Sequence, residues 1–498
     1  MGYDCPERQL PKLFEGDISH IRGTVVFHDG IVMIAKRDRE PPAAPRSQPS
    51  AVRWAAEACP GGIHYDISQR SKTMIEVTRG DAMHLYGSYG LKMDYTVRLS
   101  VRMSDPVNGE ILKDALGKTQ KRYTYLSLRI RRNAEKYYYE HNSSPVVLFH
   151  SDEQITLNSP ESNYHIWAVS YQDDRIHLDI SHGTSDGTGM YMVLSTLLYY
   201  YCAERYGLTD HTGIRTLEDP ILAEESMDPA ETVPPLPPAA LNRPKMPDAF
   251  SLLKDAGLTP SEPVIYDIEI PEEEFVRFSK EHLASPGSMT CVLFSRAIDR
   301  LFPKRESPLM NSYIINARPM ANDSKTIHNC VQTVKFEFSD EVRDRSFEEQ
   351  CRIHREITAQ FAGEKKVMEQ MAFSAGVAGM VLQKAKDIEA KKMTFGMSLD
   401  CGRKYFTYMV SYVGKWKYHQ IEPWVKEFRT HVPIANDLLI EIAAMSGRIF
   451  LSVHQKFKED IVLREVLKEL EENHIPYVLH DPVPRDNAHM IEPEAVTE

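Results

Sequence analysis

The sequence feature that most constrains the fold is a strand-like segment that runs directly into an apolar helix through a glycine-rich turn. Residues 175–180 alternate polar and apolar side chains, as a strand with one buried face does. Residues 181–187 (SHGTSDG) form the turn, and an apolar helix is expected from there to about Tyr206. The chain therefore joins sheet and helix closely, which is typical of a mixed α/β structure.

His182 lies in this turn with the same parity as the apolar residues of the strand, so it continues the buried face where the strand ends. A histidine that is desolvated there stays neutral near pH 7 and can accept a proton. Gly183, Gly187 and Gly189 let the backbone turn tightly and approach a ligand. A lone histidine on an apolar face is more often a core residue. Its combination with three glycines and Asp186 favours a catalytic base.

Asp186 has two interpretations. It is either a second catalytic carboxylate or a structural group that caps the following helix or pairs with a cation, and the structural role is the one we expect. His182 and Asp186 supply only two metal ligands, and the sequence indicates no third nearby. We therefore predict no metal site.

Strands and helices intermingle along the rest of the chain, which suggests two α/β sandwiches side by side. Further strands are expected at residues 91–103, 124–130, 164–171, 264–270, 312–317, 331–338, 406–413, 427–432, 437–445 and 448–454. Further helices are expected at residues 108–122, 273–283, 288–301, 346–361 and 461–473.

The domain boundaries follow from composition. Residues 1–78 are expected to form a weakly ordered N-terminal extension, because the Pro- and Arg-rich stretch 37–53 cannot bury enough apolar surface. The remaining expected divisions are an N-terminal lobe at 79–207, a Pro-rich connection between the lobes at 208–260, a C-terminal lobe at 261–480 and a flexible tail at 481–498.

Charge and cysteine usage limit the partners. The formal net charge of −12 over 498 residues argues against nucleic acid, because phosphate binding needs a basic surface. The seven cysteines are scattered, with no Cys-x-x-Cys pair, as free thiols in a reducing compartment are. The N-terminus has no signal-peptide pattern, and the most apolar stretch, 190–202, is too short to span a membrane. We therefore expect a cytoplasmic protein.

The pattern His182-x-x-x-Asp186-Gly187 resembles the signature of the condensation-like acyltransferases. That superfamily shares the chloramphenicol acetyltransferase fold and includes alcohol acetyltransferases and the condensation domains of nonribosomal peptide synthetases. The resemblance extends over about 80–480. It implies two lobes that form a V with a central channel, His182 as the general base, and a backbone role for Gly187.

Two segments of the second half support the resemblance. Asn316-Ala317-Arg318 is similar to the family's strand-borne arginine, so Arg318 would hold Asp186 ionised and fix the loop that bears His182. The alternative is a solvated arginine at a strand end. Residues 411–415 (SYVGK) resemble a segment that lies near the channel in alcohol acetyltransferase-like members, where Ser411 and Gly414 would help to stabilise the oxyanion. The alternative is a strand end with a turn glycine.

The resemblance implies an acyltransferase that moves an acyl group from a thioester to an alcohol or amine. Condensation domains usually have a second histidine where this chain has Ser181, so a freestanding enzyme with acyl-CoA as co-substrate and no bound cofactor is favoured. Two alternatives stay open: a stand-alone condensation domain that uses an acyl carrier protein, and a non-catalytic binding or regulatory protein on the same fold. We expect a monomer whose partners are a small-molecule acceptor and a thioester donor.

Phosphates of coenzyme A would need basic side chains near the channel, although each of these is more typical of a solvated face. The candidates in the second half are Lys391, Lys392, Arg403, Lys404, Lys415 and Lys417.

Overall fold

The computed structural model describes residues 23–28, 31–36, 74–234, 236–241, 246–321, 325–433, 436–484 and 490–496. The predicted extension at 1–78 lies largely outside these residues. Its described parts include an antiparallel hairpin of β1 (Gly23–His28) and β2 (Ile31–Lys36), and the short strand β3 (Met74–Glu76). In the part of the chain that is described, no helix is long and apolar enough to cross a membrane.

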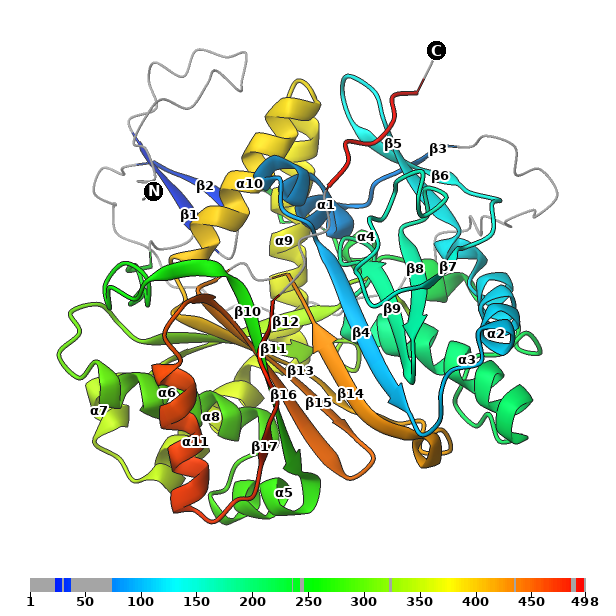
Figure 1. The fold of residues 1–498 in the computed structure, drawn as a ribbon. Helices are drawn as coiled ribbons and strands as arrows, with labels where there is room; N and C mark the ends of the chain where they lie inside the picture. The colour runs from blue at the N-terminus through cyan, green and yellow to red at the C-terminus, as the bar shows by residue number, and fades with distance from the viewer. Residues whose placement is uncertain are drawn as a thin grey trace, which may run out of the picture.

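The first half of the chain builds a five-stranded sheet covered by two helices (Figure 1). Its elements are β4 (Thr96–Met103), β7 (Leu148–His150), β8 (Trp167–Gln172), β9 (Arg175–Ser181), α2 (Gly109–Arg122) and α3 (Gly187–Tyr206), together with β14 (Val425–His431) from the second half. The strand order is β14-β4-β9-β8-β7. Leu99 and Leu178 face each other in the central antiparallel pair and are fully buried.

A smaller sheet lies beside the five-stranded one. It has the order β3-β6-β5 and contains β5 (Leu128–Arg132) and β6 (Tyr137–His141). The end of the chain lies along β5, where Val496 donates a backbone hydrogen bond to Arg132 and Glu494 pairs with Arg131 at 2.8 Å.

The second half builds a larger sheet with the order β12-β11-β13-β15-β16-β10-β17, and β18 pairs with β10. Its strands are β10 (Pro260–Pro271), β11 (Met310–Asn316), β12 (Val331–Glu337), β13 (Tyr408–Lys415), β15 (Leu438–Met445), β16 (Arg448–Phe457), β17 (Val478–Leu479) and β18 (Val483–Pro484). The pairs β11–β13 and β13–β15 are parallel, and the others are antiparallel.

Helices cover one face of this larger sheet (Figure 1). They are α5 (Glu272–Glu281), α6 (Pro286–Leu301), α7 (Asp340–Arg343), α8 (Phe347–Phe361) and α11 (Ile461–Glu472). Val410, Ile440 and Leu451 project from the sheet into a core that also contains Phe294 and Leu467. The opposite face of the sheet points toward the first half of the chain.

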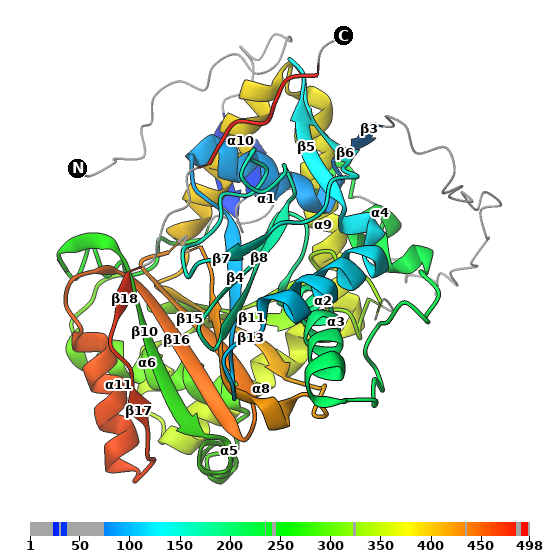
Figure 2. The same cartoon turned by 45° about the vertical axis from the view of Figure 1, so that its right-hand side comes forward.

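Two connections tie the halves together. Strand β14 comes from the second half of the chain but pairs with β4, at the edge of the first sheet. Three further helices, α1 (Arg79–Leu91), α9 (Glu364–Lys384) and α10 (Ile388–Arg403), pack on one another above both sheets. In Figure 2 the two sheets lie side by side, with α2 and α3 outside the first and α6 and α11 outside the second.

The structure confirms the mixed α/β class and most of the predicted strands and helices, corrects two predicted strands, and adds three helices. The strand expected at 91–103 begins only at Thr96, because α1 runs to Leu91 and ends on Lys92, whose φ is 50°. The strand expected at 124–130 starts with a short 3-10 turn and continues as β5. Helices α1, α9 and α10 were not predicted. Each is buried on more than one side, so its sequence lacks a single apolar face.

Candidate active site

A cavity of about 370 Å³ opens between the two sheets. Both halves of the chain line it. His84 of α1 and His182 come from the first half, whereas Ser312 of β11, Ser411 of β13 and Glu441 of β15 come from the second. The cavity therefore brings together residues that lie far apart in the sequence.

The turn between β9 and α3 is held by close packing. Asp186 is the N-cap of α3 and accepts a hydrogen bond from the Gly189 backbone at 3.0 Å. A Cβ atom on Gly189 would collide with the carbonyl oxygen of Ile327, and one on Gly187 would collide with the side chain of Val413 on β13. These glycines serve close approach between the two halves of the chain.

His182 lines the cavity, and its ring is held through one of its nitrogens. Its Nδ1 lies 3.0 Å from the carbonyl oxygen of Ser185. Because a carbonyl only accepts, Nδ1 carries the proton and Nε2 keeps its lone pair. The ring is half-buried and stacks with those of His84 and Tyr95, at centroid distances of 5.5 and 5.2 Å.

The electrostatic setting keeps His182 neutral. Burial lowers its pKa, and the Ser185 carbonyl and the charge of Asp186 offset this only in part. The neighbouring His84 is also neutral, because burial and the proximity of His182 lower its pKa to about 3. At neutral pH the Nε2 atom of His182 is thus an available base.

Asp186 and Arg318 form a buried ion pair. Two parallel hydrogen bonds of 2.8 Å join the guanidinium to the carboxylate, and each residue is only 2% exposed. Burial raises the pKa of Asp186, but Arg318 and the backbone N–H groups of Cys330 and Gly189 outweigh it, so the pKa lies below its usual range. Arg318 is therefore not a solvated strand end, and the Asp186 oxygens are committed to partners other than His182.

The segment between β11 and β12 supports this arrangement from behind. Asn329 donates to the carbonyl oxygen of His182 at 2.9 Å, and the backbone of Cys330 donates to Asp186 at 2.8 Å. Arg318 also donates to the carbonyl oxygen of His328 at 2.8 Å. Sequence reasoning noted this segment only as the start of a strand, and no local pattern marks its role.

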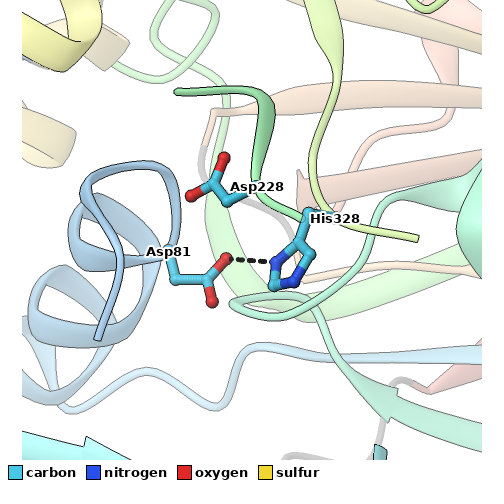
Figure 3. A group of neighbouring side chains, drawn as sticks. All are labelled: Asp81, Asp228 and His328. Carbon is cyan, nitrogen blue, oxygen red and sulfur yellow. Dashed lines mark hydrogen bonds and ion pairs between the residues drawn. The ribbon is translucent and has the colours of Figure 1, made fainter. Parts of the chain in front are cut away.

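A second ionic cluster anchors the same segment (Figure 3). His328 lies 3.1 Å from Asp81 of α1 through Nδ1 and 3.1 Å from the Ser226 carbonyl through Nε2. Both ring nitrogens face acceptors, so the ring is an imidazolium. Burial lowers the pKa of His328, but Asp81 and then Asp228 outweigh it and raise the pKa to about 9.

The cluster has the composition of a metal site but is already satisfied as an ion network. Ligand atoms of Asp81, Asp228 and His328 lie within 4.8 Å of one another. Tyr139 donates to Asp81 at 3.1 Å, and the backbone of Gly80 donates to Asp228 at 2.9 Å. A metal ion would have to compete with the N–H and O–H groups that donate to these carboxylates. The cluster is therefore better described as a link between α1 and the segment behind the candidate active site.

The other predicted site residues fall in different places. Ser411 lines the cavity together with Met409 and Val413, from the same face of β13. Gly414 is not among the lining residues. Its φ of 106° falls where the pairing of β13 with β15 shifts register, a backbone role that favours glycine.

Most of the basic residues that are candidates for binding the phosphates of coenzyme A have carboxylate or carbonyl partners. Lys391 donates to the Glu135 carbonyl, Lys392 pairs with Glu389 and Glu492, Lys404 with Asp248, and Lys415 with Glu272. Arg403 also pairs with a carboxylate, Asp400 at 3.3 Å, but unlike these lysines it lines the cavity.

Comparison with known proteins defines the fold. No protein-family model matches the sequence, and no curated protein matches it. TRI101 of F. sporotrichioides, solved with coenzyme A and T-2, superimposes with a TM-score of 0.53 at 10% identity, over 81% of this chain and 99% of its own. The first condensation domain of the CDA synthetase gives 0.52 at 14% identity, over 80% and 94%. The condensation domain of the monacolin K polyketide synthase MokA gives 0.54 at 10%, over 80% and 96%.

This chain has the chloramphenicol acetyltransferase-like fold. The fold predicted from the short pattern around His182 is therefore confirmed.

Proposed function

We propose that the protein is an acyltransferase that moves an acyl group from a thioester to a hydroxyl or amine, with His182 as general base. The observation that carries the proposal is the state of His182: a neutral imidazole whose Nδ1 is fixed by Ser185 and whose ring lines the cavity. The fold supports it, because similar structures include TRI101 with coenzyme A and condensation domains.

In the proposed reaction, Nε2 of His182 takes the proton of the acceptor as its oxygen or nitrogen attacks the thioester carbonyl. The tetrahedral intermediate then expels the thiolate, and the imidazolium returns the proton to that sulfur. No acyl-enzyme forms. Asp186 acts through position: its pairing with Arg318 fixes the start of α3, and its charge favours the transient imidazolium.

We favour acyl-CoA over a carrier-bound acyl group as the donor. Arg403 lines the cavity and pairs there with an exposed carboxylate, Asp400, with which a phosphate could compete, and Ser181 occupies the place of the second histidine of condensation domains. We also propose a monomer in the cytoplasm, with residues 208–260 as the boundary between lobes.

The test measures thiol release from acetyl-CoA and longer acyl-CoA donors with a panel of alcohols and amines. We expect turnover with the wild type and a loss of about 10²- to 10⁴-fold in His182→Ala, the range for removal of a general base. His150→Ala, at an exposed histidine of β7, is the matched control and should keep wild-type activity.

The outcome also separates the alternatives. Activity only with an acylated carrier protein would favour a condensation enzyme. Binding of coenzyme A without thiol release from any donor would make the protein a binding protein and refute the catalytic proposal.

A further inference from the structure

The cavity-facing side of the large sheet carries a buried acidic residue that has no role in the reaction proposed above. Along β15, Ile440 and Ile442 pack into the helix-covered core, so Glu441 projects from the opposite face and lines the cavity. In the parallel register of β13 and β15, Glu441 stands directly beside Ser411. Glu441 is only 6% exposed.

The surroundings of Glu441 favour its neutral form. Burial raises its pKa to about 8, and a hydrogen bond with the Ser411 hydroxyl opposes this to a smaller extent. The neighbouring elements face it with Tyr191 of α3 and Ser452 of β16, neither of which is a cation. On β14, Thr430 lines the same cavity.

The basic side chains that flank Thr430 contact another acid. Arg429 pairs with Asp267 of β10 at 2.7 Å, and His431 lies 3.5 Å from the same carboxylate. Arg429 also pairs with Glu427 at 3.2 Å. The remaining cation of β14, Lys426, donates to the Ser104 carbonyl at 2.9 Å. None of these contacts involves Glu441, which keeps its proton at neutral pH.

Ser411 lies close to the turn that bears His182. Gly187 touches Val413 so closely that a Cβ atom would not fit, and Val413 is two residues beyond Ser411 on the same face of β13. Two residues along a strand span roughly 7 Å. Ser411 and His182 line the same cavity, so we expect the Ser411 hydroxyl to face a thioester carbonyl whose acceptor is deprotonated by His182.

Building on the proposed acyl transfer, we infer that Glu441 is a positioning residue: its protonated carboxyl donates to Ser411 Oγ and so directs the Ser411 hydroxyl hydrogen at the oxyanion. A carboxylic acid has one donor, and a serine hydroxyl accepts as well as donates. A carboxylate only accepts, so ionised Glu441 would take the Ser411 hydrogen for itself and add a negative charge near the oxyanion. Ionisation of Glu441 thus removes one oxyanion donor.

The test is the profile of kcat/KM from about pH 6 to about pH 10 with an alcohol acceptor, because an amine would add its own titration. We expect the wild-type value to fall as pH rises through about 8. Glu441→Ala should be slower than the wild type below about pH 8 and should lose the alkaline fall. Glu441→Gln should restore the rate and abolish the alkaline fall, because its amide N–H donates to Ser411 and cannot ionise.

Two further variants complete the design. Ser411→Ala should lose about 10²-fold in kcat, as removal of an oxyanion donor does, and should show only the smaller alkaline fall that the charge of Glu441 causes. Glu337→Gln, at an exposed carboxylate on β12 of the same sheet, should keep the wild-type profile.

The results distinguish this inference from the proposed function. If His182→Ala is inactive but Glu441→Gln keeps the alkaline fall, acyl transfer stands and the role of Glu441 is refuted. If no donor is turned over, both are refuted. Infrared spectra test the protonation without turnover: the carboxylic-acid C=O band that Glu441→Gln removes should be present at pH 6.5 and vanish as pH rises through about 8. Its absence at pH 6.5 overturns the inference.

Discussion

Replacement of His328 by glutamine should destabilise the protein in acid and neutral solution but hardly in alkaline solution. The imidazolium of His328 links Asp81 of α1 to the segment behind the active site (Figure 3). Its pKa rises from 6.5 to about 9, chiefly through Asp81 and Asp228 against the effect of burial. At about 1.4 kcal/mol for each pH unit, this rise corresponds to about 3 kcal/mol of stabilisation.

The sign follows from proton linkage. A group whose pKa is raised by folding stabilises the native state fully below its unfolded pKa, here 6.5, and loses the effect as pH rises through about 9. The wild type should therefore be more stable than His328→Gln by about 3 kcal/mol near pH 6 and by less than about 1 kcal/mol near pH 10.

The assay is urea unfolding of both proteins at each pH, followed by circular dichroism. Comparison at the same pH cancels the titration of all other groups, and His150→Gln, at an exposed histidine, should match the wild type throughout. An equal difference between wild type and His328→Gln at both pH values would refute the argument, because the effect would then come from packing and not from charge.

Three further predictions concern the active-site turn. Arg318→Met should cost about 3–5 kcal/mol in urea unfolding, because it leaves Asp186 buried without its cation; a loss below about 1 kcal/mol would contradict this account of the pair. Gly189→Ala should cost about 1–3 kcal/mol and lower kcat, since its Cβ would meet the Ile327 carbonyl; unchanged stability and kcat would show that the turn has room. Because the pKa of His182 is lowered, kcat/KM should stay level as pH falls to about 6.5 and decline only below it, and a decline that begins above pH 7 would contradict a neutral His182.

Local sequence patterns predicted the elements whose residues alternate between apolar and polar or form a long apolar run. Strand β9 and helix α3 were expected at nearly their observed positions, because one face of the strand is apolar and the helix is apolar along most of its length. Helices α9 and α10 escaped prediction, because they touch several elements and so lack one apolar stripe. Strand β14 was expected as a strand, but nothing local shows that it pairs with β4 of the other sheet.

The same division holds for the site. The sequence by itself determined that His182 ends a buried strand and is followed by a glycine-rich turn and a helix, because these are properties of neighbouring residues, while it left a helix cap as one of several roles for Asp186. The tertiary structure decided that Arg318 meets Asp186, that Asn329 holds the His182 backbone, and that Glu441 stands beside Ser411.

The physical reason is that charge and burial act through space. Burial by residues from both halves of the chain lowers the pKa of His182 and raises that of Glu441, whereas the charges of Asp81 and Asp228 raise the pKa of His328 against the effect of burial. The short pattern around His182 thus pointed to the proposed base, while the packing of two sheets around one cavity decided its protonation and its partners.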